Sequence, residues 1–261
     1  MLVNRTLERM LPPASRSPQV VHEAMRYCVL SGGKRFRPLL ALGGCEAVGA
    51  PVRHALSTAC ALELIHTYSL VHDDLPAMDN ADERRGLPTC HRKFGEGNAI
   101  LVGDALLTMA FELMGRNGTP NSLSIVRMIG QACGTNGLIG GQILDLQTMS
   151  RTWAGTERAL REIAQRKTAA LITASVVVGA LAGNAGSSAV SKLERYGQRV
   201  GLAFQLLDDV HDREGLAQEL GADEAKAEAG RLIAQAIKIL ESFGKRAELL
   251  RSLATWLAST A

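Results

Sequence analysis

Hydrophobic side chains recur every three or four residues along most of this 261-residue chain. The pattern is clearest over residues 56–65, 100–113 and 200–210. A period near 3.6 residues is typical of amphipathic helices, whereas a half-buried strand requires alternation with a period of two. No long stretch alternates in that way. The sequence therefore predicts an all-α fold, a helical bundle of about ten helices in a single domain over residues 1–261.

Composition argues against several classes of protein. Twenty-nine Lys and Arg against 26 Asp and Glu leave a formal net charge of +3, which is not the charge excess typical of nucleic-acid binding. The most apolar stretch, 169–183, is shorter than the roughly 20 residues that span a bilayer, so it predicts a buried central helix and no membrane segment. The N-terminus lacks the apolar run of a signal peptide. Five scattered cysteines without a CxxC pair predict reduced thiols that act as small buried hydrophobes in a cytoplasmic protein.

A first acidic cluster lies in the segment HDDLPAMDNADERRG, residues 72–86. Its carboxylates include Asp73, Asp74 and Asp79, which raise each other's pKa unless cations neutralise them. Because Pro76 disfavours a continuous helix, we expect Asp79 to fold back from a distorted helix end. Taken alone, such a run is typical of a solvated helix end.

A second cluster, FQLLDDVHD, favours a chemical role for both. Asp208, Asp209 and Asp212 form a DDxxD pattern, in which Asp208 and Asp212 share one helix face and Gln205 precedes them by one turn. Like charges at this spacing destabilise a bare helix, so we expect a compensating cation. Oxygen ligands alone favour Mg²⁺ over zinc. Because Mg²⁺ held by few carboxylates completes its shell with water and substrate phosphates, the predicted ligand is a diphosphate.

Donors for a diphosphate are also present. The candidates are cations or hydroxyls near a turn or a helix start: Lys34, Arg35 and Arg37 in the glycine-opened segment GGKRFRP, Arg84 and Arg85 after the first acidic cluster, and Lys167 and Thr168 before the long apolar helix. Each alone is typical of a surface charge. Together with two aspartate clusters they favour a diphosphate site, since arginine grips phosphate with a two-pronged fork.

These motifs, in this order, resemble those of the trans-prenyl diphosphate synthases, and most of all the bacterial farnesyl diphosphate synthases. The resemblance runs from about Tyr27 to Asp212 and includes HDDLPAMDNADERRGLPTCHRKFGEGNAILVGDALL, GGQILDL and RKTAALI. It implies an isoprenoid-synthase-type bundle around a deep central cavity, working as a homodimer. It also implies a prenyltransferase that condenses isopentenyl diphosphate head-to-tail with dimethylallyl or geranyl diphosphate, with farnesyl diphosphate as the expected product.

The resemblance also assigns roles by motif match. It implies three Mg²⁺ ions held by Asp73, Asp79 and Asp208, with Asp74 and Asp212 as further candidate ligands. It places Arg84 and Lys167 on the allylic diphosphate with Thr168 and Gln205 nearby, and Lys34, Arg37, His66 and Arg85 on isopentenyl diphosphate. We expect Asp73, Asp79, Asp208, Lys167 and Arg84 to be catalytic.

Tyr68 and Ser69 are candidates for the control of product length. They lie five and four residues before Asp73, where they can form the floor of the cavity. Farnesyl-producing bacterial relatives carry an aromatic residue at the position of Tyr68. Packing in an ordinary core is an equally good reading of Tyr68.

The resemblance stops after Asp212. The family usually continues with a Gly-Lys loop, a further Asp and a Gly-Lys-Thr-Tyr-Pro segment, whose lysines close over the diphosphates; none of these follows here. Alternatives to the farnesyl reading are therefore a geranylgeranyl or geranyl diphosphate synthase, or a weakly active or regulatory subunit of a prenyl synthase. A terpene cyclase or head-to-head synthase is disfavoured by GGKRFRP, because a cyclase has no second substrate diphosphate to hold.

Overall fold

The computed structural model describes residues 2–116, 118–149 and 156–259, which are helical apart from one short hairpin and the connections. This confirms the predicted all-α fold. The chain divides into two compact units, which we describe separately. Unit 1 comprises Met1–Pro38 and Leu56–Gly118, and unit 2 comprises Leu39–Ala55 and Thr119–Ala261. The single domain over residues 1–261 and the deep central cavity stay predictions.

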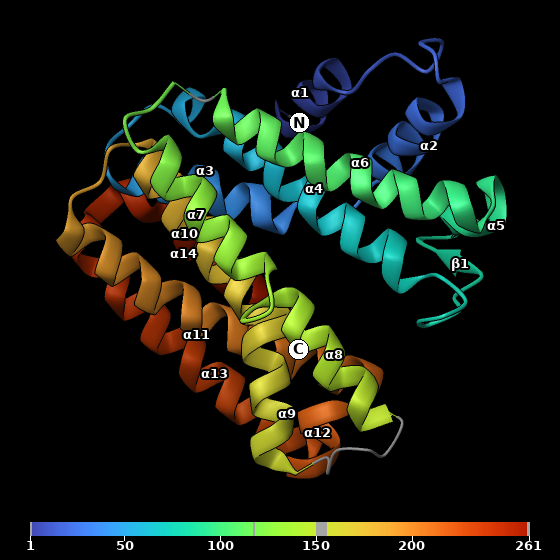
Figure 1. Cartoon of the computed structure of the whole chain (residues 1–261). Coiled ribbons are helices and arrows are strands. Elements are labelled where there is room, and N and C mark those ends of the chain that lie inside the picture. Colours follow the sequence, from blue (N-terminus) through green and yellow to red (C-terminus); the bar gives the residue numbers. More distant parts are fainter. Residues whose placement is uncertain (1, 117, 150–155, 260–261) are drawn as a thin grey trace. The chain divides into compact units, whose positions relative to one another are not determined.

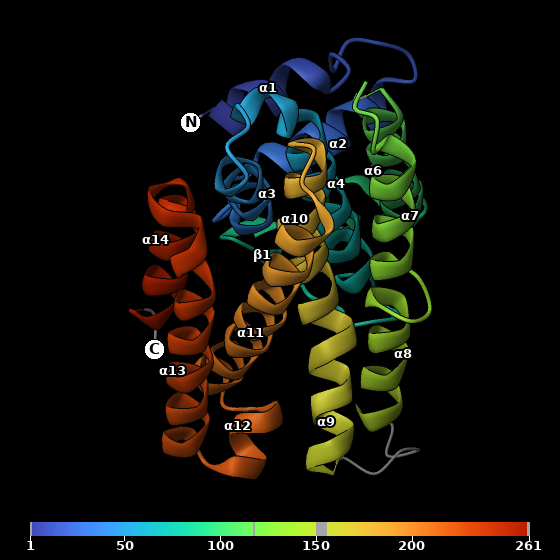
Figure 2. The same ribbon diagram turned by 90° about the vertical axis from the view of Figure 1, so that its left-hand side faces the viewer.

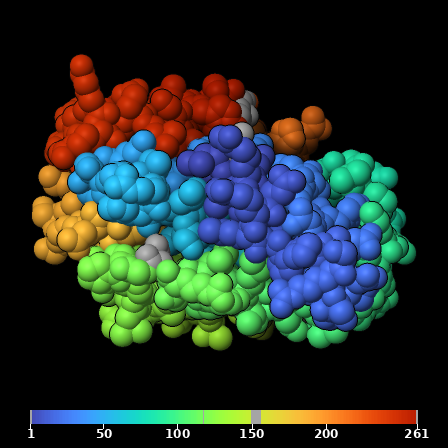
Figure 3. Space-filling view, turned by 90° about the horizontal axis from the view of Figure 1, so that it is seen from above, coloured from blue at the N-terminus to red at the C-terminus, as the bar shows by residue number. Residues whose placement is uncertain are grey.

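Unit 1 is built around α4. Its elements are α1 (Leu2–Met10), α2 (Gln19–Leu30), α4 (Leu56–Asp73), β1 (Glu83–Arg84), β2 (Leu87–Pro88), α5 (Cys90–Phe94) and α6 (Glu96–Gly115). The strands β1 and β2 pair antiparallel. Helices α4 and α6 run side by side (Figure 1). Figure 3 shows α1 and α2, in blue, at the surface of this unit.

A glycine makes the contact between α4 and α6 close. A Cβ atom on Gly103 of α6 would lie 2.0 Å from Nε2 of His72 on α4. The same His72 nitrogen is 3.0 Å from the carbonyl oxygen of Ile100. The end of α4 that carries the first acidic cluster is thus fixed against α6.

Unit 2 contains the remaining helices. They are most of α3 (Phe36–Ala47), η1 (Val52–His54), α7 (Ser122–Cys133), α8 (Leu138–Met149), α9 (Glu157–Ile163), η2 (Ala164–Ala169), α10 (Ala170–Ala182), α11 (Ser187–Asp212), α12 (Gly215–Leu220), α13 (Ala222–Ile239), η3 (Leu240–Ala247) and α14 (Glu248–Ala258). Ten of the thirteen residues of α10 are buried. A helix that is apolar on every side belongs in a core, so the predicted buried central helix is confirmed.

The second acidic cluster lies at the end of α11. Figure 2 shows α11 and α13 side by side, with α12 in the connection between them. Helix α11 ends at Asp212, and its C-cap residue Arg213 adopts the left-handed conformation with φ 60°. This short connection occupies the position at which the resemblance led us to look for the Gly-Lys loop.

Helix α6 also presents apolar side chains to solvent. Ile100 is 47% exposed and Leu101 is 60% exposed. Within the described ranges, α6 is the one helix whose length and composition would allow it to cross a membrane, and 39% of its apolar window is buried. The expectation that the chain has no membrane segment stays a prediction.

Candidate active site

The first acidic cluster folds back on itself at the end of α4. The backbone N–H of Asp79 donates to the carbonyl oxygen of Asp73 at 2.8 Å, and that of Asn80 donates to Leu75 at 3.0 Å. This acidic return, residues 73–80, contains Pro76 and has the fold that the sequence predicts. Asp79 is exposed and Asp73 is half-buried. The return brings two carboxylate-bearing residues together on an accessible surface, and hard oxygen ligands of this kind suit Mg²⁺.

The neighbouring acid, Asp74, forms an ion pair with Arg84. Its side chain is buried, and Arg84 Nε donates to Oδ1 at 2.8 Å and to Oδ2 at 3.0 Å. Arg84 Nη2 lies 2.7 Å from Oδ1. Charge-assisted contacts of this kind fix the plane of a guanidinium group. Asp74 therefore orients the predicted allylic-diphosphate ligand Arg84, while its candidacy as a metal ligand stays a prediction.

The hairpin brings Arg85 to the GGKRFRP segment. Arg85 lies in the two-residue turn between β1 and β2 with φ 57°, and its Nη1 donates to the carbonyl oxygen of Gly32. A Cβ atom on Gly33 would lie 2.8 Å from the Arg85 guanidinium carbon. Gly33 therefore makes room for the Arg85 guanidinium, while Gly32 accepts its hydrogen bond. Unit 1 thus gathers Arg85 with the segment that carries Lys34 and Arg37, which the sequence predicts to bind one diphosphate.

His66 is neutral among these cations. Burial, followed by the positive charges of Arg37 and Arg85, holds the pKa of His66 well below its usual 6.5. Arg84 and Arg35 act in the same direction. A cluster of cations that keeps a neighbouring imidazole uncharged produces the positive potential that an anion requires.

A buried ion pair beneath this cluster was not predicted. Arg35 has φ 52° and is buried, and its Nη1 lies 2.5 Å from Oε1 of Glu63 on α4. Arg35 also donates from Nε to Asn4 at 2.9 Å and from Nη2 to the Val29 carbonyl at 2.7 Å. The pair anchors the segment between Lys34 and Arg37 to α4. One signal was available: Glu63 is the single acid within the apolar run 59–65 of α4, and a buried charge requires a partner.

Tyr68 and Ser69 both have packing roles. Tyr68 is buried, and its ring meets His72 edge-on at a centroid distance of 5.9 Å. Ser69 Oγ donates to the carbonyl oxygen of His66 at 3.0 Å. Control of product length by either residue stays a prediction.

In unit 2, a π-helix carries Lys167 and Thr168. The segment η2 is one wide turn between α9 and α10, and such turns often occur at functional sites. Lys167 Nζ lies 2.5 Å from Oδ2 of Asp145 on α8. Gly141, one turn before Asp145, lies so close to η2 that a Cβ atom would be 2.3 Å from the backbone nitrogen of Lys167. Asp145 was not among the predicted site residues, although it belongs to the GGQILDL motif.

Thr168 begins a chain of hydrogen bonds that ends on α12. Its hydroxyl donates to Gln205 Oε1 at 2.5 Å, and Gln205 Nε2 donates to Asp209 Oδ1 at 2.6 Å. The backbone N–H of Leu216 donates to the second carboxylate oxygen of Asp209 at 2.7 Å. This Thr168–Asp209 chain joins two predicted substrate residues, Thr168 and Gln205, and fixes which way the Gln205 amide points.

The DDxxD carboxylates of α11 divide into two groups. Asp208 and Asp212 are exposed, whereas Asp209 is buried and its pKa is raised, chiefly by burial. Glu214 adds a further acid: burial, Asp212, Asp209 and Asp145 raise its pKa, and Lys167 opposes them. The exposed carboxylates lie in a negative environment that favours a cation.

Neither acidic cluster is a complete metal centre by itself. In the described part of the chain, no three His, Cys, Asp or Glu side chains gather closely enough to hold an ion by themselves. Mg²⁺ commonly takes only one or two carboxylates and fills its remaining positions with water and phosphate oxygens. The donor set therefore fits Mg²⁺ bound together with a phosphorylated ligand.

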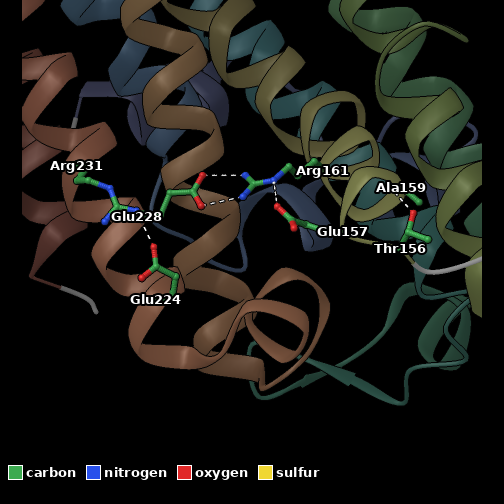
Figure 4. A network of polar contacts seen from close by, with 7 residues as sticks. All are labelled: Thr156, Glu157, Ala159, Arg161, Glu224, Glu228 and Arg231. Carbon is green, nitrogen blue, oxygen red and sulfur yellow. Dashed lines mark hydrogen bonds and ion pairs between the residues drawn. The ribbon is translucent and has the colours of Figure 1, made fainter.

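A salt-bridge network supports the segment that leads to η2 (Figure 4). Arg161 on α9 pairs with both carboxylate oxygens of Glu228 on α13, at 2.8 and 2.9 Å, and with Glu157 at 2.8 Å. Thr156 caps α9 by accepting from the backbone N–H of Ala159 at 3.3 Å. These contacts hold α9 against α13 and so fix the start of the π-helix.

Comparison with known proteins defines the class. The fold matches that of a solved FPP/GFPP synthase from Zymomonas mobilis with a TM-score of 0.92 and 36% identity, over 98% of this chain and 94% of that one. The fold is thus that of the all-α isoprenoid synthases. Residues 18–255 match the Polyprenyl synthetase family. The chain belongs to this family.

Two curated relatives come from Arabidopsis thaliana. A putative geranylgeranyl pyrophosphate synthase 8 is 46% identical over 231 residues, which are 86% of this chain and 63% of that protein. The large subunit 1 of a heterodimeric geranylgeranyl pyrophosphate synthase is 44% identical over 233 residues, 86% of this chain and 62% of that protein. The chain thus spans less than two thirds of the length of these relatives.

Proposed function

We propose that this chain is a prenyltransferase that condenses isopentenyl diphosphate head-to-tail with dimethylallyl or geranyl diphosphate. The observation that carries the proposal is the pairing of accessible carboxylates with oriented cations in each unit. In unit 1 the acidic return lies next to Arg84, which Asp74 orients. In unit 2 the Asp208 helix lies next to Lys167, which Asp145 orients. Family membership and the similarity to an FPP/GFPP synthase support the same activity.

Asp73, Asp79 and Asp208 would hold Mg²⁺, for which the resemblance implies three ions. Bound Mg²⁺ neutralises the charge that develops on a departing diphosphate. Arg84 and Lys167 would bind that diphosphate. Because Asp74 and Asp145 fix these two cations in advance, little reorganisation accompanies cleavage of the allylic C–O bond. Thr168 and Gln205 are held in one orientation beside Lys167 by the Thr168–Asp209 chain.

Isopentenyl diphosphate would bind to the cations of unit 1. Lys34, Arg37 and Arg85 supply the positive charge, and the neutral His66 adds a hydrogen bond without a further charge to desolvate. After the alkene has attacked the allylic carbon, a proton leaves. No dedicated general base is evident among the site residues, and the released diphosphate is a sufficient acceptor.

Farnesyl diphosphate is the product we propose, because buried Tyr68 lies five residues before Asp73. Geranylgeranyl diphosphate is the second candidate, favoured by the names of the curated relatives. The two products differ in chain length by one isopentenyl unit. Chromatography of the dephosphorylated product against C15 and C20 standards decides between them.

A weakly active or regulatory subunit is a further candidate function. The connection between α11 and α13, residues 213–221, contains no lysine, whereas family members close a lysine-bearing loop over the diphosphates. One relative is named as a subunit of a heterodimeric synthase. Turnover by the purified chain alone would argue for an active synthase, whereas turnover only after addition of a catalytic partner would support the subunit reading.

We also propose that the chain is a cytoplasmic homodimer, with exposed Ile100 and Leu101 of α6 covered by a second copy. Two neighbouring exposed apolar side chains on one helix suit such a contact. Sedimentation should give twice the 27.9 kDa mass of one chain. A Leu101→Glu variant should sediment as a monomer, whereas a dimeric variant would contradict the assignment to this face.

Two single-site variants test the metal assignment. Asp73→Ala and Asp208→Ala should each lower Mg²⁺-dependent elongation of geranyl diphosphate by isopentenyl diphosphate by about two orders of magnitude or more, since each removes charge stabilisation at the departing diphosphate. Glu112→Ala, at an exposed acid near the C-terminal end of α6, is the matched control and should keep full activity. Full activity in both site variants would contradict the metal assignment.

A further inference from the structure

Two of the five cysteines are partners. Cys28 on α2 is half-buried, while Cys90, the first residue of α5, is buried. Both thiols line one small cavity, and their interaction raises the pKa of Cys28 and lowers that of Cys90. The other three cysteines are Cys45, Cys60 and Cys133, and all are buried. All five cysteines are free thiols, and the expectation that they are buried holds for four of them, whereas Cys28 is half-buried.

Contacts on both sides hold the two sulfur atoms together. Tyr27, the neighbour of Cys28, donates from its hydroxyl to the carbonyl oxygen of Pro88 at 2.7 Å. Its ring also meets the Phe94 ring edge-on at 5.5 Å. Pro88 and Phe94 flank Cys90 along the chain, so α2 is fixed against the start of α5. These contacts therefore keep Cys28 and Cys90 close to each other.

A small cavity gives access to the pair. It has a volume of about 40 Å³, enough for a water-sized molecule, and Cys28 and Cys90 both line it. Asp74, Arg84 and Thr89 line the same cavity. A small oxidant such as hydrogen peroxide is of the size that this space admits. The thiol pair therefore shares a cavity with Arg84, which the proposed function places on the allylic diphosphate.

We propose that Cys28 and Cys90 form a redox modification site, in which a peroxide converts the two thiols into a reversible disulfide. The Cys90 thiolate attacks one peroxide oxygen, so that an S–O bond forms and the O–O bond breaks. Cys28 then attacks the Cys90 sulfur, an S–S bond forms, and the S–O bond breaks. Overall, two thiols and one peroxide give one disulfide and two waters, with the thiols oxidised by two electrons.

The electrostatics favour Cys90 as the first nucleophile. The hydrogen bond from Cys28 lowers the pKa of Cys90, and the same bond, together with burial, raises the pKa of Cys28. The thiolate is the reactive form of cysteine. Cys28 is then the resolving thiol, because it lines the same cavity as the sulfur that it must attack.

The disulfide would also act on the diphosphate site, a consequence that rests on the proposed function. A disulfide holds its sulfur atoms about 2.05 Å apart, which is shorter than any thiol–thiol hydrogen bond, so α2 and the start of α5 must approach each other. Thr89, next to Cys90, is bonded to Ala81 at 2.8 Å and to Asp82 at 3.0 Å. The displacement therefore reaches the hairpin that carries Arg84 and Arg85.

Mass spectrometry tests the site independently of activity. The full chain is treated with hydrogen peroxide, alkylated under denaturing conditions and digested. We expect a Cys28–Cys90 linked peptide that dithiothreitol removes, with three of the five cysteines still alkylated. Cys28→Ser and Cys90→Ser should each abolish the link, and Cys133→Ser, the matched control, should keep it. An unlinked Cys28 and Cys90 after oxidation of the native chain would overturn the proposal.

Enzyme kinetics test whether the Cys28–Cys90 disulfide changes substrate binding at the diphosphate site. Oxidation should raise the KM for isopentenyl diphosphate several-fold in the native chain, dithiothreitol should restore it, and Cys28→Ser should show no change. An unchanged KM in protein that mass spectrometry shows to be fully linked would overturn the coupling. Failure of the elongation reaction itself would appear already in the reduced chain, so it is distinguishable from failure of this inference.

Discussion

Asp209 has a different environment from the other carboxylates of its motif. The DDxxD pattern predicts two carboxylates on one face of α11, and these are the exposed Asp208 and Asp212. The middle carboxylate is buried, with one oxygen bonded to Gln205 and the other to the backbone of Leu216. We therefore propose that Asp209 is a positioning residue, which would act on a bound diphosphate through Gln205 and Thr168.

Replacement of Asp209 should weaken binding of the allylic substrate and leave binding of isopentenyl diphosphate unchanged. In Asp209→Asn, the amide nitrogen faces either the Gln205 amide or the Leu216 N–H, and two donors then oppose each other. Loss of one buried hydrogen bond costs about 1–3 kcal/mol, which corresponds to roughly a tenfold rise in the KM for the allylic substrate. The KM for isopentenyl diphosphate should stay near its native value. Equal rises in both KM values would show a merely structural role.

His66 should contribute to the loss of stability in acid. Its folded-state pKa lies below its usual 6.5, so the unfolded chain binds a proton that the folded chain does not. Stability is fully present above pH 6.5 and is lost as the pH falls below that value, with a slope of at most about 1.4 kcal/mol per pH unit. Urea denaturation at pH 7 and pH 5 should therefore show a smaller loss in His66→Gln than in the native chain. An equal loss in both would contradict the assignment.

Side-chain partners were the least predictable feature at the residue scale. Local sequence indicates that Asp73, Asp208, Arg84 and Lys167 belong to a site, because charged residues gather there in recognisable motifs. The residues that orient these groups carry a weaker signal. Asp145 meets Lys167 only because Gly141 brings α8 against η2, and that approach is a property of the tertiary packing.

Secondary-structure elements were predictable where one physical effect, such as burial of apolar side chains, determines their environment. The stretch 169–183 contains hardly a polar side chain, so burial is the only stable environment for it, and α10 is indeed buried. The return of the acidic segment follows from Pro76 in the same way. The π-helix η2 could not be predicted, because its extra residue per turn depends on the neighbours of Lys167 and not on the propensity of the segment AQRKTA.

The contact between α9 and α13 should be strong enough to measure. Glu228 and Arg161 are only 20% and 28% exposed and meet through two parallel hydrogen bonds. Glu228→Gln should lower the free energy of unfolding by about 1–2 kcal/mol at pH 7. Glu224→Gln, which breaks the exposed pair with Arg231, is the matched control and should cost no more than about 0.5 kcal/mol.

The loss of stability in Glu228→Gln should also depend on pH. The hydrogen bond from Arg161 lowers the pKa of Glu228 below its usual 4.5. The stabilisation is therefore present above pH 4.5 and is lost as the pH falls through the folded-state pKa. The difference between native chain and Glu228→Gln should shrink in strong acid. A difference that is constant with pH would show that packing, and not the ion pair, holds α9 to α13.

At the scale of the whole molecule, we expect the length of the product to depend on how much space lies beyond Tyr68. If Tyr68 forms the floor of the product cavity, Tyr68→Ala should shift the product from C15 to longer chains, because a smaller side chain removes that floor. Tyr68→Phe keeps the ring and should keep C15. Liquid chromatography with mass detection measures the distribution. An unchanged C15 product from a folded Tyr68→Ala protein would show that Tyr68 only packs the core.

We propose that the two acidic clusters and the cations beside them act in prenyl elongation. The most direct measurement is incubation of the purified chain with Mg²⁺, isopentenyl diphosphate and geranyl diphosphate, followed by identification of the prenyl product. We expect a C15 diphosphate whose formation requires all three additions. Absence of any product elongated by isopentenyl diphosphate, from chain shown to be folded, would rule out the proposed activity.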